Sequence, residues 1–286
     1  MRLALSTSGR YATRETFQAY KNAGIEAMEI SDGRIESAEL IDFPALKALA
    51  DEYGITLTTY HLPFSPFDKL DPSNPTLADR TVDCFRAFID KATAVGIMTF
   101  VIHPSGEPIK EEDRPARLGC ARRSLARLAE HAAKKGAVIA VEDLPRTCLG
   151  RDSSDILSLI SAHPALRVCF DTNHLLSEDI GEFIERVGAW IVTTHVSDYD
   201  FVNERHWLPG EGQIDWISLK TALDKVGYDG YWLYETGVGG SNWTIDRERC
   251  LTHADIRRNY NEIMAGKIPT PFGVAKKDLP MFQPKN

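Results

Sequence analysis

The sequence is poor in cysteine and has no long apolar segment. Its five cysteines are odd in number, scattered, and include no C-x-x-C pair, so neither a disulfide framework nor a thiolate zinc site is predicted. The opening residues MRLALSTSGR hold too short an apolar run for a signal peptide, and no run of about 18 apolar residues could cross a bilayer. These absences predict a soluble protein of the reducing cytoplasm.

The sequence also lacks an excess of basic residues. It holds 33 Lys and Arg against 41 Asp and Glu, and the net charge of −8 argues against a general affinity for nucleic acid or anionic lipid, although a local basic groove is compatible with it. No G-x-G-x-x-G or G-x-x-x-x-G-K-[ST] motif follows any apolar run. A nucleotide cofactor therefore has no support in the sequence.

What the sequence does contain is a repeated alternation of short apolar runs and amphipathic segments. Eight runs have strand character: 3–7, 27–31, 55–61, 98–103, 137–143, 166–171, 190–196 and 231–236. Between them, apolar residues recur at helical spacing, with Gly, Pro and Asn at the junctions. Such strands alternating with helices form a parallel sheet, so eight units in 286 residues predict an α/β fold, the (β/α)8 or TIM barrel.

Ionisable side chains stand at the ends of six successive runs. In a (β/α)8 barrel the carboxyl ends of the strands form the mouth that holds the active site. The six residues that fall there are His61, His103, Glu142, Asp171, His195 and Glu235. Any one of them alone is as well explained by a structural role such as helix capping, but together they would repel one another and lose hydration unless a cation neutralised them. The pattern therefore predicts a metal site.

The last four of these strands are neighbours around the barrel, so their side chains can close on one ion. The predicted ligands are Glu142, Asp171, His195 and Glu235. Carboxylates with one imidazole suit a single divalent ion, Mn, Mg, Co or Zn. The predicted substrate-binding residues around the ion are His61, His103, His174 and His206. The other histidines, His131, His163 and His253, are expected on amphipathic helices as surface or packing residues.

Five motifs carry a resemblance to a known superfamily: VED (141–143), FDTNH (170–174), THVSD (194–198), HWLPGEGQIDW (206–216) and YET (234–236). Over about residues 1–265 the sequence resembles the xylose isomerase-like TIM barrel superfamily, which groups sugar and sugar-phosphate isomerases and epimerases with abasic-site DNA endonucleases of the endonuclease-four type (AP endonuclease family 2). The motifs are specific for the superfamily and much less so for the substrate.

The likeness to ketose 3-epimerases assigns roles to these residues. It implies that one divalent metal is held by Glu142, Asp171, His195 and Glu235. It also implies that His174 contacts substrate, and that Glu142 and Glu235 are the catalytic acid/base pair. One departure is that these epimerases carry another Glu a few residues after the first ligand, where this chain reads LPRTC.

Other functions stay open. The endonuclease-four family holds three zinc ions, and its ligand types recur here, with Glu204 standing where that family has Asp. A chain of net charge −8, with acidic loops such as SDYDFVNER, is poorly equipped to neutralise DNA phosphates, which favours a small-molecule enzyme. A keto-sugar or inosose dehydratase, which is a lyase, would use the same metal and proton abstraction. A non-catalytic sugar-binding protein would have less reason to retain every ligand.

The predicted function is therefore a metal-dependent sugar or sugar-phosphate isomerase or epimerase, acting by proton transfer through a metal-stabilised enediolate. The expected partner is a small-molecule carbohydrate, with no nucleic acid and no membrane, and a homo-oligomer is compatible with the sequence. One barrel domain is expected over 1–265, followed by a Pro-rich C-terminal tail over 266–286. This tail is expected to dock on its own barrel or on a neighbouring subunit through Phe272, Leu279, Met281 and Phe282.

Overall fold

The computed structural model describes residues 1–64, 68–277 and 279, and its centre is a parallel β-barrel. The strands are β1 Arg2–Ser6, β2 Ala27–Ser31, β3 Thr56–His61, β4 Thr99–Ile102, β5 Val138–Glu142, β6 Leu166–Asp171, β7 Ile191–His195 and β8 Tyr231–Tyr234. They follow the order β7-β6-β5-β4-β3-β2-β1-β8, and the ring closes where Val196 bridges Tyr234 in parallel register. The predicted TIM barrel is confirmed, and each predicted run overlaps one of its strands.

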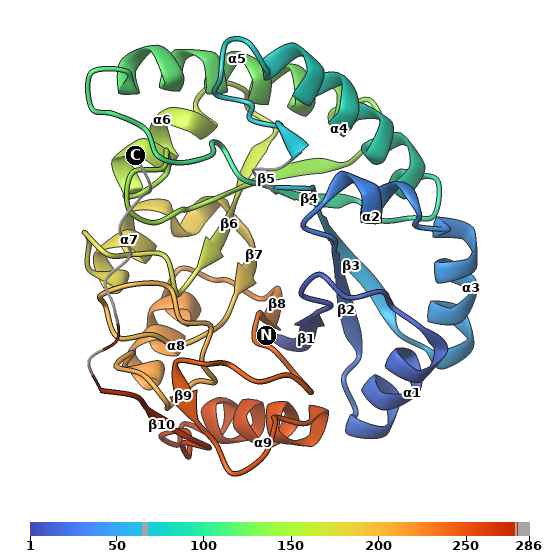
Figure 1. Ribbon diagram of the computed structural model, residues 1–286, viewed down its shortest axis with the longest axis vertical. Coiled ribbons are helices and arrows are strands. Elements are labelled where there is room, and N and C mark those ends of the chain that lie inside the picture. The colour runs from blue at the N-terminus through green and yellow to red at the C-terminus, as the bar shows by residue number, and fades with distance from the viewer. Residues whose placement is uncertain (65–67, 278, 280–286) are drawn as a thin grey trace.

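Helices pack around the outside of the barrel (Figure 1). They are α1 Arg14–Ala23, α2 Ile35–Glu39, α3 Phe43–Tyr53, α4 Ala78–Thr93, α5 Arg114–Ala133, α6 Ser153–Ile160, α7 Ile180–Val187, the 3-10 turn η2 Gly188–Trp190, α8 Trp216–Lys225 and α9 His253–Met264. Sequence-local signals set their ends, as where the Asp215 carboxylate accepts hydrogen bonds from the first-turn amides of α8. Within the described ranges, no helix combines the length and apolar character needed to cross a bilayer.

Each strand sends alternate side chains to opposite faces of the sheet, and this alternation positions the site. On β5, Ile139 and Val141 join the large core between sheet and helices, whereas Ala140 packs with Val101 and Cys169 in a separate small cluster inside the barrel. On five strands, an ionisable residue stands two positions after a small or apolar residue that faces the inside of the barrel. The pairs are Ala27 and Glu29, Val101 and His103, Ala140 and Glu142, Cys169 and Asp171, and Leu233 and Glu235.

The prediction that His163 lies on a helix is wrong. Helix α6 ends at Ile160, and His163 lies in the turn that leads to β6. Its ring Nδ1 accepts a hydrogen bond from the backbone amide of Ala165 at 3.1 Å. The physical reason is Pro164, because the residue before a proline is disfavoured in the helical conformation.

Part of the C-terminal tail packs against the segment that precedes α9. The strand β10 (Val274–Ala275) pairs antiparallel with β9 (Ile245–Asp246). Phe272 is partly buried against the main core, and the Arg249 guanidinium lies 4.5 Å from the centre of its ring. Two of the expected anchors, Met281 and Phe282, lie outside the described residues.

Candidate metal centre at the barrel mouth

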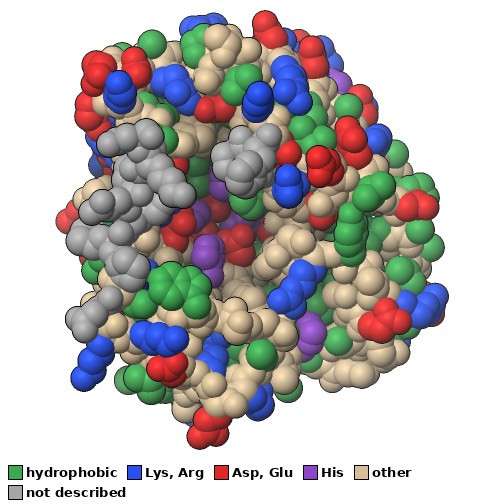
Figure 2. Space-filling view, viewed as in Figure 1, with side chains coloured by type: hydrophobic (Ala, Val, Ile, Leu, Met, Phe, Trp, Pro, Cys, Tyr) green, Lys and Arg blue, Asp and Glu red, His purple; other side chains and the backbone are tan. Residues whose placement is uncertain are grey.

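The carboxyl ends of β5 to β8 bring four potential metal ligands together. One ligand atom from each side chain lies within 4.8 Å of the others in the group Glu142, Asp171, His195 and Glu235. The first three end their strands, and Glu235 follows β8 by one residue. Acidic and histidine side chains gather in the hollow at the centre of the face seen in Figure 2. We call these four residues the acidic group.

Glu142 lies at the middle of the mouth and contacts imidazoles on two sides. Its Oε1 is 3.0 Å from Nδ1 of His195, while its Oε2 is 3.0 Å from Nε2 of His61 and 3.2 Å from Nε2 of His103. Only 1% of the Glu142 side chain is exposed. Each oxygen of one buried carboxylate is thus available to a separate ligand group.

Besides Glu142, Cys169 and His195, a group that adds only the Cys169 thiol to residues already named, two further groups of potential ligands adjoin the acidic group. The first consists of His61, His103 and Glu142, which it shares with the acidic group. The second consists of His174, Glu204 and His206, in which His174 Nε2 lies 3.5 Å from Glu204 Oε1. Since His206 Nδ1 is also 3.7 Å from Glu235 Oε2, this group touches the acidic group as well. The structure therefore brings all eight site residues expected from the sequence to one mouth.

The acidic group contains three carboxylates and a single imidazole. Burial raises the pKa of the Asp171 carboxyl well above its usual range, and the nearby Glu235 and Glu142 carboxylates raise it further. The Asp171 Oδ2 atom is buried and has no hydrogen-bond partner among the described residues. A carboxylate oxygen in this position is costly to leave without a cation or donor. The donor set and this unpartnered atom fit a divalent metal ion.

Glu142 and His195 favour their charged forms. Burial acts to raise the pKa of Glu142, but the His195 and His103 imidazoles outweigh it and hold that pKa well below its usual range. Burial acts to lower the pKa of His195, but the negative groups around it, Cys169, Glu29 and Glu142 among them, raise it well above its usual range. The pair resembles an internal salt bridge, and a bound metal would take the place of the imidazole's proton.

The sequence motif FDTNH (170–174) organises the mouth through its backbone and side chains. Thr172 donates through Oγ1 to the Ser197 carbonyl at 2.6 Å. Asn173 accepts at Oδ1 from the backbone amide of Arg205 at 3.0 Å, which holds the loop that carries Glu204 and His206. Thr172 and Asn173 therefore tie the end of β6 to the segment beyond β7, while His174 Nδ1 lies 2.7 Å from the carbonyl oxygen of Asp143, which follows β5.

Glu29 is a buried residue of the centre that sequence reasoning missed. It lies on β2, and its Oε2 is 3.1 Å from His195 Nε2 and accepts from Thr59 Oγ1 at 2.7 Å. This contact fixes the ring of His195 so that Nδ1 turns toward Glu142 and the acidic group. The available signal was a glutamate in the middle of the apolar run AMEIS, at a position that faces the inside of the barrel.

The segment LPRTC places a cation beside the mouth. Arg146 has a backbone φ of 58°, and its Nη2 lies 3.1 Å from Glu204 Oε1. The same guanidinium contacts the Glu107 carboxylate, with Nε 3.1 Å from Oε2. A positive φ is uncommon for a residue with a side chain, and such strain is concentrated at functional sites.

The fold and this geometry define a class: a TIM barrel with a candidate metal site of carboxylates and imidazoles at the carboxyl ends of its strands. The chain belongs to the xylose isomerase-like TIM barrel family, whose sequence model matches residues 17–252.

Known proteins agree with this assignment. An uncharacterised protein of Methanocaldococcus jannaschii is 27% identical over 234 residues, which cover 78% of this chain and 76% of that protein. The structure of an L-ribulose 3-epimerase superposes with a TM-score of 0.76 at 18% identity, covering 93% of this chain and 94% of the other. The E. coli 3-keto-D-glucoside 4-epimerase gives 0.72 at 17% identity, covering 93% and 99%. These structural likenesses establish the fold.

Proposed function

We propose that the protein is a divalent-metal-dependent isomerase or epimerase of a sugar or sugar derivative. The observation that carries the proposal is the convergence of Glu142, Asp171, His195 and Glu235 at one barrel mouth. Family membership and the fold shared with carbohydrate epimerases support the same reaction class. A bound metal would polarise a substrate carbonyl and stabilise the negative charge that develops when a neighbouring C–H proton is removed.

The protein's own carboxylates would move the proton. The pKa of Glu142 lies well below its usual range, so this carboxylate is ionised, the form that a general base must have. Glu235 is the more accessible of the pair, with 14% of its side chain exposed against 1% for Glu142. We assign the two residues as the acid/base pair, and return of the proton from the opposite side of the substrate carbon would give epimerisation.

Four histidines would hold and enclose the substrate. His103 and His206 have 23% and 39% of their side chains exposed, so both reach the open mouth and can bond to sugar hydroxyls. The side chains of His61 and His174 are only 1% and 5% exposed. Burial lowers the pKa of His174, which keeps that ring neutral and able to serve as both hydrogen-bond donor and acceptor.

A second candidate function is metal-dependent phosphodiester hydrolysis of the endonuclease-four type. The observation that favours it is the presence of the two extra ligand groups, His61–His103–Glu142 and His174–Glu204–His206, on either side of the acidic group. Clustered metals support in-line displacement at phosphorus. Against it stands the net charge of −8, which weakens attraction to DNA phosphates.

Proton exchange separates these functions. We expect the metal-loaded protein to exchange a carbon-bound proton of at least one keto-sugar in a panel with deuterated water, measured by proton NMR. Product analysis then distinguishes epimer, isomer and dehydrated product. A protein that binds three metals by elemental analysis, exchanges no sugar proton and cleaves an abasic-site duplex would replace the first candidate by the second.

A further inference from the structure

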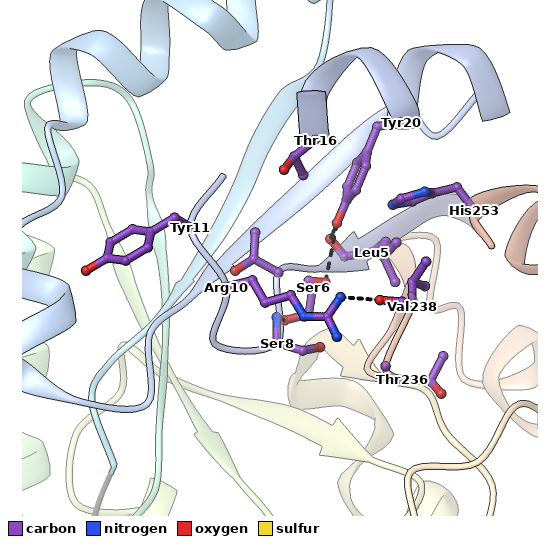
Figure 3. Close-up of a pocket in the computed structure, with 12 residues that line it drawn as sticks. Leu5, Ser6, Ser8, Arg10, Tyr11, Thr16, Tyr20, Thr236, Val238 and His253 are labelled. Atoms are coloured by element: carbon purple, nitrogen blue, oxygen red, sulfur yellow. Dashed lines mark hydrogen bonds between the residues drawn. The ribbon is translucent and has the colours of Figure 1, made fainter. Parts of the chain in front are cut away.

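A second cavity opens beside the metal centre, between the loop after β1 and the segment after β8. Its volume is about 180 Å³, and Figure 3 shows the side chains that line it. Ser8 and Arg10 come from the first loop, Thr16 from α1, Thr236 and Gly237 from the segment after β8, and His253 from the start of α9. We call this cavity the Arg10 pocket.

The Arg10 pocket contains a positive charge and no negative one. No Asp or Glu lines it, and Arg10 forms no ion pair within the part of the chain that the structure describes. In Figure 3 its guanidinium points across the pocket to the carbonyl of Val238, to which it donates. Two arginines elsewhere in the molecule do pair with carboxylates, Arg117 with Asp71 at 2.5 Å and Arg247 with Glu211 at 2.5 Å.

The loop that carries Arg10 is held in one conformation. Ser8 has a φ of 47°, in the left-handed region that non-glycine residues rarely occupy. Hydrogen bonds secure it on both sides, since Gly9 N donates to the Ser31 carbonyl at 2.8 Å and Arg10 N to the Thr7 carbonyl at 3.1 Å. A strained loop fixed in this way presents its cation with little entropy left to lose on binding.

Backbone and hydroxyl groups complete the pocket. A Cβ atom built on Gly237 would meet no atom within 4 Å, so the backbone there is open to a ligand. The hydroxyls of Ser8 and Thr16 lie around the same space, whereas the Thr236 hydroxyl donates to the His206 carbonyl at 2.8 Å. Hydroxyl groups beside a guanidinium and an open glycine backbone are the donors that recognise phosphate and carboxylate oxygens.

The pocket is directly connected to the metal centre through the chain. Thr236 follows Glu235, a member of the acidic group, and Ser6 on β1 pairs in register with Glu29 on β2. Glu29 in turn contacts His195. The pocket and the acidic group therefore share the carboxyl end of the barrel, which is the arrangement that a substrate reaching both would need. In TIM barrels generally, segments after the last strands and the start of an extra helix often bind phosphate.

We propose that the Arg10 pocket binds an oxyanion, phosphate or carboxylate, carried by the end of the sugar substrate remote from the metal. This proposal rests on the proposed function, whose substrate it narrows to an anionic sugar. Arg10 supplies the charge, and the hydroxyls and open backbone supply the remaining donors. Sugars without an anionic group leave the guanidinium unpaired and are expected to be poorer substrates.

Calorimetric titration of the metal-loaded protein with inorganic phosphate, and separately with acetate, tests the pocket itself. We expect Arg10→Gln to weaken phosphate binding about 10- to 100-fold, because a charge-assisted hydrogen bond is lost. Arg10→Lys should retain part of the affinity. The matched control is Arg122→Gln, an exposed arginine on the outer helix α5, which should bind phosphate as the wild type does. Tighter binding of acetate than phosphate would identify carboxylate as the natural group.

Steady-state kinetics test the link to the substrate. The panel pairs each keto-sugar with its terminal phosphate and with its terminal carboxylate, and the measured quantity is the ratio of KM values within a pair. Wild-type protein should prefer the anionic member, and Arg10→Gln should remove that preference. Two results would contradict anion binding by the Arg10 pocket: equal phosphate affinity of wild type and Arg10→Gln, or a wild-type preference for neutral sugars. Neither result would contradict the proposed isomerase activity. Arg10-dependent phosphate binding without turnover of any sugar overturns the proposed function instead.

Discussion

The acidic group and the Arg10 pocket border one barrel mouth and have opposite electrostatics. In the acidic group, the Asp171 carboxylate lies beside those of Glu142 and Glu235, and the group contains no lysine or arginine. In the Arg10 pocket, the cation has no carboxylate. Ion pairs between arginine and carboxylate do occur close by, since Arg146 pairs with Glu204. Between the acidic group and the Arg10 pocket, however, the two signs of charge are separated, as expected if the first holds a metal and the second an anion.

The largest expected effect comes from removing a proton carrier of the acidic group. Glu142→Gln and Glu235→Gln each keep an oxygen near the metal but cannot accept a proton, so kcat should fall by about 10² or more. Both variants should retain the secondary structure of the wild type by circular dichroism. Full turnover in either variant would contradict the two-carboxylate mechanism. The acidic group and the Arg10 pocket would then differ in charge alone and not in catalytic role.

The next effect concerns Glu29, which supports the acidic group from behind. Glu29→Gln weakens its contact with His195 Nε2 and with it the orientation of the ring. Loss of such a supporting partner typically lowers metal affinity about 10- to 100-fold. Competition with a chelator measures the change in Mn²⁺ affinity. Thr99→Ala, at the amino end of β4, serves as control. Equal Mn²⁺ affinities of Glu29→Gln and wild type would show that Glu29 does not support the metal site.

The stabilisation by metal should increase with pH. In the metal-free protein the folded-state pKa of Asp171 lies above its ordinary value of 3.8, and that of His195 lies above 6.5. Raising the pH therefore removes protons that the folded state binds more tightly, and metal-free stability falls through the window that opens at 3.8 and closes above 6.5. Metal binds the deprotonated ligands. The rise in Tm on adding Mn²⁺ should thus grow with pH across this window, and a constant rise would refute the assignment.

The smallest effect is expected from removing the C-terminal tail, no described residue of which belongs to the acidic group or lines the Arg10 pocket. Deletion after Gly266 removes the pairing of β10 with β9 and the contact of Phe272 with Arg249. If these contacts contribute about 1 kcal/mol, Tm falls by about 2–4 °C. Turnover and phosphate binding should not change, and mass in solution would reveal a role in assembly. A large loss of activity would mean that the tail belongs to the mouth.

Sequence alone predicted the parts of this molecule that follow a local period. The eight strands and the ligands at their ends could be read because apolar runs and the polar residue that ends each one are adjacent in the chain. Glu29 escaped notice because it lies within a run, not at its end. His163 was misplaced because helical spacing outweighed the effect of Pro164.

The Arg10 pocket could not have been predicted in the same way. The contact between Arg10 and Val238 joins residues 228 positions apart, and it exists only because closure of the barrel makes β8 a neighbour of β1. No local pattern records such a contact. The pairing of β10 with β9 is equally invisible, since two residues are too few to show a period.

The alternation along each strand also bears on how such a protein can change over evolution. Ala140 and Glu142 are neighbours on the inward face, yet Ala140 packs with Val101 and Cys169 in the barrel floor, the layer below the mouth, while Glu142 belongs to the mouth itself. A rise of about 3.3 Å per residue puts some 7 Å between the two layers. Substitutions at the mouth need not disturb the packing of the floor, so new substrates can be acquired on an inherited barrel with little penalty in folding. The same separation recommends the mouth positions, Arg10 included, as the place to begin laboratory redesign.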